Sequence, residues 1–255
     1  MADNEHPPPA APESEAEVGR GKYIVIEGPE AVGKSTQVDW LVDALAARNI
    51  VARSDIREPG GSPIGEQIRG ILKDDNLPRS PLANLYLFNA ARTQTLEVIE
   101  AELKQGKWVV SDRNHWSSYA YQVWGEGVDA DVFEQITAPL KHKLEPDMTV
   151  FLMTSREKQQ ERLQERGDDD YFQSQDSHFH ARVRAGYLEA AEGRAGLIDG
   201  EGTREEVHQR VQAFISGIIG GRGDYVAETY QETAQAIHAQ ARRKYNPAPG
   251  SFGAT

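Results

Sequence analysis

The sequence has no cysteine, no long apolar run and no excess of positive charge. Without cysteine, disulfides, cysteine-ligated zinc sites and thiol catalysis are excluded. No stretch of about 18 apolar residues occurs, so we expect no membrane-spanning helix. The formal net charge of -12 disfavours a nucleic-acid partner, because proteins that bind nucleic acids usually carry a basic face. The amino terminus lacks the apolar stretch of a secretory signal, so we expect a cytoplasmic protein.

The 255 residues, of which 38% are hydrophobic, suffice for one sizeable core. Residues 1–20 are rich in proline, alanine and glutamate and are predicted to be a disordered tail, because they bury too little apolar surface to offset the entropy of ordering. Residues 21–220 are predicted to form the folded domain. The composition shifts after residue 220, and residues 221–255 are predicted to be a partly helical extension with one helix at 225–244.

Short β-branched segments alternate with amphipathic segments through the predicted domain. We predict strands at 23–27, 51–56, 108–111, 148–153 and 195–199, and helices at 35–48, 63–73, 81–105, 155–166, 176–192 and 205–219. This alternation is typical of a three-layer α/β fold, with a five-stranded parallel sheet covered by helices on both faces. Ligands of such sheets bind at the carboxyl ends of the strands.

A phosphate-binding loop follows the first predicted strand. Residues 28–35 (GPEAVGKS) fit the pattern G-x-x-x-x-G-K-[ST] between a strand and a helix. Gly28 and Gly33 allow the backbone to form a nest of N–H groups, and the helix that follows adds its positive dipole end. Lys34 would bridge the β- and γ-phosphates, and the Ser35 hydroxyl would ligate Mg²⁺. The loop predicts ATP as a ligand together with Mg²⁺.

Three further segments lie at strand ends or on the long helix. Arg57 begins REPGG and can meet a phosphate, although the segment is also compatible with an ordinary turn. Phe88 and Arg92 are four residues apart on one helix face and can form a platform for a base, although by themselves they fit a core ring and a solvated cation better. Asp112 and Arg113 follow the strand WVVS, where Asp112 can hold Mg²⁺ or orient the attacking oxygen.

Together these segments resemble the thymidylate kinase family of P-loop nucleoside monophosphate kinases. The motifs that carry the resemblance are IEGPEAVGKST at 26–36, REPGG at 57–61, FNAARTQ at 88–94, DRNHWSSYAYQ at 112–122 and PDMTVF at 146–151. They follow the family's order, and the resemblance covers about residues 22–218. It implies the P-loop kinase fold and transfer of the γ-phosphoryl group of ATP to dTMP, which gives dTDP and ADP. It also implies a homodimer.

The resemblance implies a role for each matched position in the acceptor pocket. Phe88 would stack on thymine, Arg92 would contact a thymine carbonyl, and Ser118 would be a polar contact of the base. Tyr121 would lie under the sugar and exclude a 2′-hydroxyl.

At the phosphates, Arg57 and Arg113 would hold the phosphate of dTMP, and Glu30 would approach the sugar 3′-hydroxyl or the metal. Lys34, Asp112 and Arg113 would be catalytic, and Asp112 would share the metal with Ser35. The residues that would contact ATP are Gly28, Glu30, Gly33, Lys34, Ser35 and Thr36. The acceptor oxygen is already anionic, so catalysis would consist of positioning and charge neutralisation without a strong base.

The match weakens where the family closes an arginine-bearing lid over ATP. The loop at 28–35 contains no arginine, which is typical of the bacterial members. Arg162 is then the candidate for a lid contact with ATP, and Arg166 the candidate for a catalytic lid residue, although both fit an exposed charged helix equally well. Tyr171 and Glu126 stand where the family has arginines, so relative to the family two cations are missing near the polyphosphate. We therefore expect a working kinase that is slow or takes a modified pyrimidine.

Two other functions are compatible with these residues. One is a kinase that accepts dUMP or a 5-modified dUMP. The other is a regulatory protein of the same fold that binds nucleotides without turnover. A nucleic-acid motor with the same loop is disfavoured, because the chain is acidic and carries the acceptor motifs instead.

Overall fold

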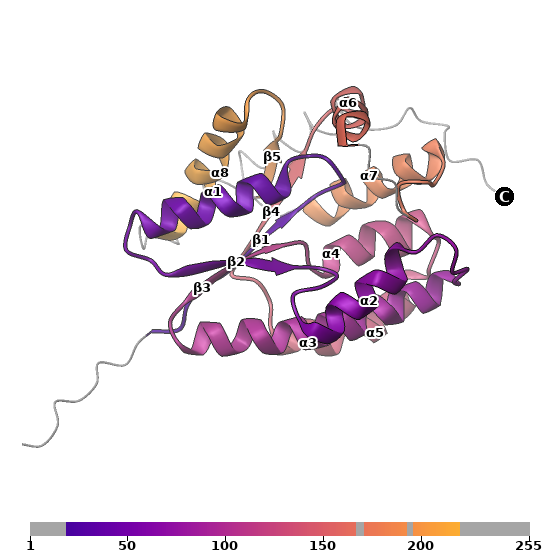
Figure 1. Cartoon of the computed structure of the whole chain (residues 1–255), viewed down its shortest axis with the longest axis horizontal. Helices are drawn as coiled ribbons and strands as arrows, with labels where there is room; N and C mark the ends of the chain where they lie inside the picture. The colour runs from indigo at the N-terminus through magenta and orange to yellow at the C-terminus, as the bar shows by residue number, and fades with distance from the viewer. Residues whose placement is uncertain (1–18, 167–170, 193–195, 220–255) are drawn as a thin grey trace, which may run out of the picture.

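The computed structural model describes residues 19–166, 171–192 and 196–219, so the helix predicted at 225–244 lies outside the described ranges. Five parallel strands form one sheet in the order β2-β3-β1-β4-β5 (Figure 1). The strands are β1 (Tyr23–Glu27), β2 (Ala52–Arg57), β3 (Trp108–Asp112), β4 (Met148–Met153) and β5 (Leu197–Asp199). The five-stranded parallel sheet predicted from the alternation is confirmed.

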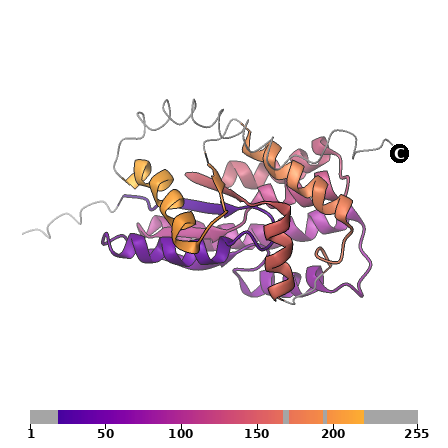
Figure 2. The ribbon, with the colours of Figure 1, turned by 90° about the horizontal axis from the view of Figure 1, so that it is seen from above.

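Helices cover both faces of the sheet (Figures 1 and 2). The helices are α1 (Lys34–Ala46), α2 (Pro63–Lys73), α3 (Pro81–Lys104), α4 (His115–Ser118), the π-helix η1 (Tyr119–Gly125), α5 (Ala130–Lys143), α6 (Arg156–Arg166), α7 (Ser177–Ala191) and α8 (Arg204–Ile219). Successive side chains of a strand point to opposite faces. In β1, Ile24 and Ile26 therefore share a core with α1 and α8, whereas Tyr23 and Val25 share another with α3.

Helix boundaries follow from local capping. The Ser62 and Ser80 hydroxyls accept hydrogen bonds from backbone N–H groups of the first turns of α2 and α3, and a proline occupies an early position of each helix. The predicted bounds of 63–73 for α2 and 148–153 for β4 are confirmed. The predicted bounds of 23–27 for β1 are confirmed as well, and the remaining predicted elements differ from the structure by one or two residues at one or both ends.

Three elements, α4, η1 and α5, are absent from the prediction. Helix α5 contains Pro139, which conceals the helical pattern because proline usually ends a helix. The π-helix η1 begins within the second half of the DRNHWSSYAYQ motif, and its turns are wider than those of an α-helix. So short a segment of this kind leaves no periodic pattern in the sequence. In addition, Arg20, assigned to the predicted tail, pairs with Asp147 at 3.0 Å.

The sheet brings two distant motifs together at one edge. Ile26 pairs with Asp112 across β1 and β3, so the loop after β1 and the Asp112-Arg113 step after β3 leave the sheet side by side. The Arg113 N–H donates to the Ile26 carbonyl at 3.0 Å. No helix within the described ranges is long and apolar enough to cross a membrane.

Candidate active site

The turn between β1 and α1 uses backbone conformations that favour glycine. Gly28 and Gly33 have φ values of 141° and 102°, and a Cβ on Gly28 would lie 2.2 Å from the carbonyl oxygen of Leu152. Gly33 is the N-cap of α1 and has no side chain to bond the first N–H groups of the helix. Those groups remain available to an anion, as the loop motif predicts.

Lys34 is buried at the start of α1, with 7% of its surface exposed. Its Nζ donates to the Pro29 carbonyl at 2.6 Å, so the ammonium lies inside the loop. Burial, together with the positive charge of Arg113, lowers the pKa of Lys34 to about 8, and the carboxylates of Asp112 and Glu30 only partly oppose this effect. The site therefore holds a cation that phosphate would stabilise.

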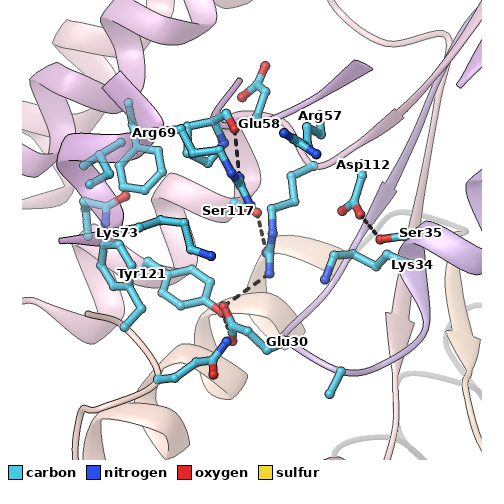
Figure 3. Close-up of a pocket in the computed structure, with 18 residues that line it drawn as sticks. Glu30, Lys34, Ser35, Arg57, Glu58, Arg69, Lys73, Asp112, Ser117 and Tyr121 are labelled. Carbon is cyan, nitrogen blue, oxygen red and sulfur yellow. Dashed lines mark hydrogen bonds and ion pairs between the residues drawn. The ribbon is translucent and has the colours of Figure 1, made fainter. Parts of the chain in front are cut away.

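Ser35 and Asp112 meet across the site. The Ser35 hydroxyl donates to Asp112 Oδ2 at 2.8 Å (Figure 3). The other carboxylate oxygen, Asp112 Oδ1, is buried and has no hydrogen-bond partner among the described residues. One hydroxyl and one carboxylate are the hard oxygen ligands that Mg²⁺ takes alongside phosphates and water. Elsewhere in the described ranges, no group of three acidic, histidine or cysteine side chains forms a metal site. The pair thus fits the predicted Mg²⁺.

Arg113 connects several parts of the site. Its φ of 77° is uncommon for a residue with a side chain and turns the guanidinium back over the phosphate-binding loop. Nη1 donates to the Gly28 carbonyl at 2.9 Å, to the Ser117 hydroxyl at 2.9 Å and to the Tyr187 hydroxyl at 2.5 Å. Nη2 contacts Glu30 at 3.3 Å. One side chain therefore bridges the loop, α4 and α7.

Glu30 lies between this arginine and an aromatic ring. The Tyr121 hydroxyl donates to Glu30 Oε2, and the guanidinium of Arg113 lies 5.5 Å from the centre of the Tyr121 ring. Burial alone would raise the pKa of Glu30, but Arg113 and Lys34 hold that pKa below its ordinary value. Glu30 is therefore a carboxylate in the neutral pH range, and its negative charge lies between the lysine and the tyrosine.

A cavity of about 300 Å³ links the loop to an aromatic wall (Figure 3). Lys34, Ser35 and Asp112 lie on one side of it, and Tyr121 and Lys73 lie on the other. The lining combines cations, acids and rings from seven elements and their loops: Glu30, Ala31, Lys34, Ser35, Arg57, Glu58, Pro59, Arg69, Leu72, Lys73, Phe88, Asp112, Arg113, Ser117, Tyr121, Gln122, Phe172 and Gln173. Phe88, which was predicted to stack on the base, lines the same cavity as Lys34.

Arg92 and Ser118 are not among the described residues that line this cavity. Arg92 forms a buried ion pair with Glu58 at 2.7 Å, and each side chain is 3% exposed. Its guanidinium also donates to the Ser118 hydroxyl at 3.0 Å. The two predicted base contacts thus bond to each other one layer behind the wall, and their contact with a base stays a prediction. Burial raises the pKa of Glu58, and Arg92 opposes this effect.

Arg57 reaches the cavity from the end of β2 and remains half exposed. Its Nη2 pairs with Glu66 of α2 at 3.0 Å, and Glu66 also accepts from the Gly61 N–H at 3.1 Å. Gly61 of REPGG therefore helps to position the acid that holds Arg57. Thr36 lies partly buried in the first turn of α1.

The lid candidates have different outcomes. Arg162 donates to the carbonyls of Ala31 and Val32 in the phosphate-binding loop, at 3.3 and 3.2 Å, and to that of Gly200 at 3.3 Å. It therefore ties α6 to the loop and is not a solvated cation. Arg166 ends α6, but its side chain lies outside the described part of the chain, as do residues 167–170.

The structure adds residues that the sequence reasoning did not assign to the site. Arg69 and Lys73 of α2 line the cavity, and their spacing of four residues on a predicted helix was the available signal. Phe172 packs against Phe88 with ring centres 5.8 Å apart, and Phe172 belongs to none of the sequence motifs. Gln122 ends the DRNHWSSYAYQ motif and lines the cavity.

Comparisons with known proteins agree with this geometry. A family model described as thymidylate kinase matches residues 26–211. Among curated relatives, the thymidylate kinase of Carboxydothermus hydrogenoformans is 36% identical over 203 residues, which cover 79% of this chain and 100% of that protein. The thymidylate kinase of Methylococcus capsulatus is 38% identical over 205 residues, which cover 79% and 98%.

Solved structures give the same result. Thymidylate kinase from Candida albicans superposes with a TM-score of 0.63 at 26% identity, covering 77% of this chain and 92% of that one. Thymidylate kinase from Ehrlichia chaffeensis superposes with a TM-score of 0.58 at 25% identity, covering 77% and 99%. With the loop, the Asp112-Arg113 step and the aromatic wall all around one cavity, we conclude that this chain belongs to the thymidylate kinase family.

Proposed function

We propose that the protein transfers the γ-phosphoryl group of ATP to dTMP and forms dTDP and ADP. One observation carries the proposal: Lys34 of the phosphate-binding loop and the Phe88 ring line the same cavity of about 300 Å³. A phosphate donor at one end and a flat base at the other would lie end to end across the strand tips. The family membership supports the same reaction, and nothing favours the alternative acceptors or a non-catalytic role.

On the donor side, the loop N–H groups, Lys34 and Thr36 would hold the ATP phosphates. Ser35 and Asp112 would hold Mg²⁺, which supplies charge neutralisation at the phosphate oxygens when bound. Lys34 now donates to the Pro29 carbonyl, so it would exchange that contact for phosphate oxygens. Arg162 would contact ATP from α6, and Arg166 would reach the transferred group.

On the acceptor side, Arg57 and Arg113 would grip the dTMP phosphate, and Phe88 would stack on the base. Tyr121 would exclude a ribose 2′-hydroxyl, and its bond to Glu30 fixes the ring in that position. Catalysis would rest on orientation and on Arg113 and Lys34 neutralising the transferred charge, since the attacking phosphate oxygen needs no base.

The test measures ADP release with ATP, Mg²⁺ and a panel of dTMP, dUMP, dCMP and UMP, with each acceptor's binding measured by calorimetry. We expect turnover with dTMP and the highest kcat/KM for it. Binding of ATP and dTMP without ADP release would refute the kinase and favour a regulatory protein. A higher kcat/KM for dUMP would refute dTMP as the preferred acceptor.

We further propose a cytoplasmic homodimer, in which α2 and α3 supply the interface. These helices pack together, and large apolar side chains stand exposed on or beside them: Ile64, Ile71, Leu77, Leu82 and Tyr86. Several large apolar side chains exposed on two helices that pack together are compatible with a protein contact. Light scattering should give twice the 28.3 kDa chain mass, and Tyr86→Glu should shift it to one chain. A monomeric wild type would refute the interface.

A further inference from the structure

Gln122 presents one half of its amide to the protein and leaves the other half unused. The residue belongs to η1, is 0% exposed and lines the cavity. Its Nε2 donates to Glu126 Oε2 at 3.0 Å. Its carbonyl oxygen Oε1 is buried and meets no hydrogen-bond partner from the described ranges. Leaving a buried acceptor unpaired is destabilising, so a donor on a bound ligand would stabilise this oxygen.

The orientation of that amide is determined by a chain of hydrogen bonds behind the wall. Arg79 Nε donates to Asn84 Oδ1 at 2.9 Å, and Asn84 Nδ2 donates to Glu126 Oε1 at 2.6 Å. A guanidinium can only donate and a carboxylate can only accept. The Asn84 amide therefore has one orientation, and Glu126 must take its second bond from an N–H of Gln122.

Other contacts hold the two ends of this chain in place. The Arg79 guanidinium also donates to the carbonyls of Leu72, Asp74 and Leu77, and it lies 4.5 Å from the centre of the Tyr171 ring. The Tyr171 hydroxyl hydrogen-bonds to Glu126 as well. Glu126 thus accepts from three side chains, and as a carboxylate it has no proton to donate to a rotated Gln122 carbonyl. If the amide turned over, its oxygen would face a carboxylate oxygen.

We propose that Arg79, Asn84 and Glu126 form an orienting relay, which fixes the Gln122 carbonyl as an acceptor for the base. The matching ligand is a pyrimidine with a donor at N3, as in thymine and uracil. Cytosine has an acceptor at N3 and would meet a second acceptor. The inference rests on the proposed function, since it assumes that the base lies against Phe88. It makes Glu126, where the family has arginine, a positioning residue for base selection.

The relay predicts the effect of removing the charge on Glu126. In Glu126→Gln, the new amide keeps the volume but can donate from its own NH₂ group to Gln122 Oε1. Gln122 can then turn over and present N–H to the base. We expect the ratio of Kd for dCMP to Kd for dTMP to fall at least about tenfold, because discrimination by a buried polar group is worth about 1–3 kcal/mol. If Glu126 had a merely structural role, Glu126→Gln would weaken the binding of dTMP and dCMP alike.

The experiment measures equilibrium binding of dTMP and dCMP by calorimetry, and so does not depend on turnover. Glu134→Gln is the matched control, because Glu134 is half exposed and pairs only with Lys141 among the described residues; its ratio should equal that of the wild type. Gln122→Leu should abolish the preference for dTMP.

Two outcomes would overturn the relay. One is a wild type that binds dTMP and dCMP equally, and the other is an unchanged ratio in Glu126→Gln. Failure of the proposed function gives a different result, since ADP release would then be absent while selective binding of dTMP persists. That outcome would leave the relay supported and the kinase reaction refuted.

Discussion

We expect Lys34 to lower the stability of the folded protein, although the activity of the protein depends on it. Its pKa is lowered from 10.5 to about 8, chiefly by burial. One pKa unit corresponds to about 1.4 kcal/mol. Keeping this ammonium charged therefore costs about 3 kcal/mol of folding free energy at pH 7. Lys34→Met removes the charge and keeps a flexible side chain of similar length.

We therefore expect Lys34→Met to unfold with a free energy about 3 kcal/mol higher than the wild type in urea at pH 7, and with a Tm about 6–12 °C higher. The same variant should release no ADP from ATP and dTMP, since the loop loses its phosphate-binding cation. The urea and thermal unfolding measurements are both made without nucleotides, phosphate or sulfate in the buffer, because a bound anion would stabilise only the wild type.

The pH dependence supplies a second test. Between pH 8 and pH 10.5 the unfolded wild type holds a proton at Lys34 that the folded protein has lost, so wild-type stability increases with pH in this range relative to the variant. The difference should thus be constant below pH 7 and disappear near pH 10.5. Lys104→Met is the control, because Lys104 is exposed and pairs with Glu100 at 2.7 Å; it should change stability by less than about 0.5 kcal/mol. A destabilised Lys34→Met would refute the reasoning.

Further predictions concern the acceptor side and the metal. Arg57→Ala should raise the KM for dTMP roughly 10–100-fold, because a charged hydrogen bond is worth about 1.5–3 kcal/mol, with Tm unchanged since Arg57 is half exposed; an unchanged KM in steady-state kinetics would exclude it from the phosphate site. Arg92→Met should lose about 3–5 kcal/mol in urea unfolding, because it leaves the Glu58 carboxylate buried without its partner, and adding Glu58→Met should restore part of that loss. Tyr121→Ser should raise kcat/KM for UMP relative to dUMP, and an unchanged ratio would refute exclusion by the ring. EDTA should stop ADP release, and added Mg²⁺ should restore it.

The fold was accessible from the sequence because the elements that matter carry strong local signals. The β-branched strands are buried on both faces, and the glycine-rich loop and the Asp112-Arg113 step directly follow strands. Side-chain pairing between distant segments was not accessible. Arg92 was expected to face the base, yet Glu58 holds it in a buried ion pair. The motif does not specify how deeply each of its side chains is buried. The pattern of Phe88 and Arg92 specifies a helix face but not which of the two reaches the cavity.

Glu126 illustrates the same limit in the opposite direction. In the sequence it appeared as a cation missing from the polyphosphate end. In the structure it accepts hydrogen bonds from Asn84 and Gln122, so its acidity serves a buried network formed by α3 and η1. Burial raises its pKa, and three donors oppose that rise. Only the tertiary fold brings Asn84 within reach, across 42 positions of the chain.

The several bonds of Arg113 restrict how this site can be redesigned. The same guanidinium holds the Gly28 carbonyl and Glu30 in the phosphate-binding loop and the Tyr187 hydroxyl on α7. A substitution that shifts α7 to admit a bulkier acceptor would pull on the turn that carries the donor. New acceptor specificity would thus be gained more readily from α2, which lines the pocket without a hydrogen bond to this side chain in the described ranges, than from α7.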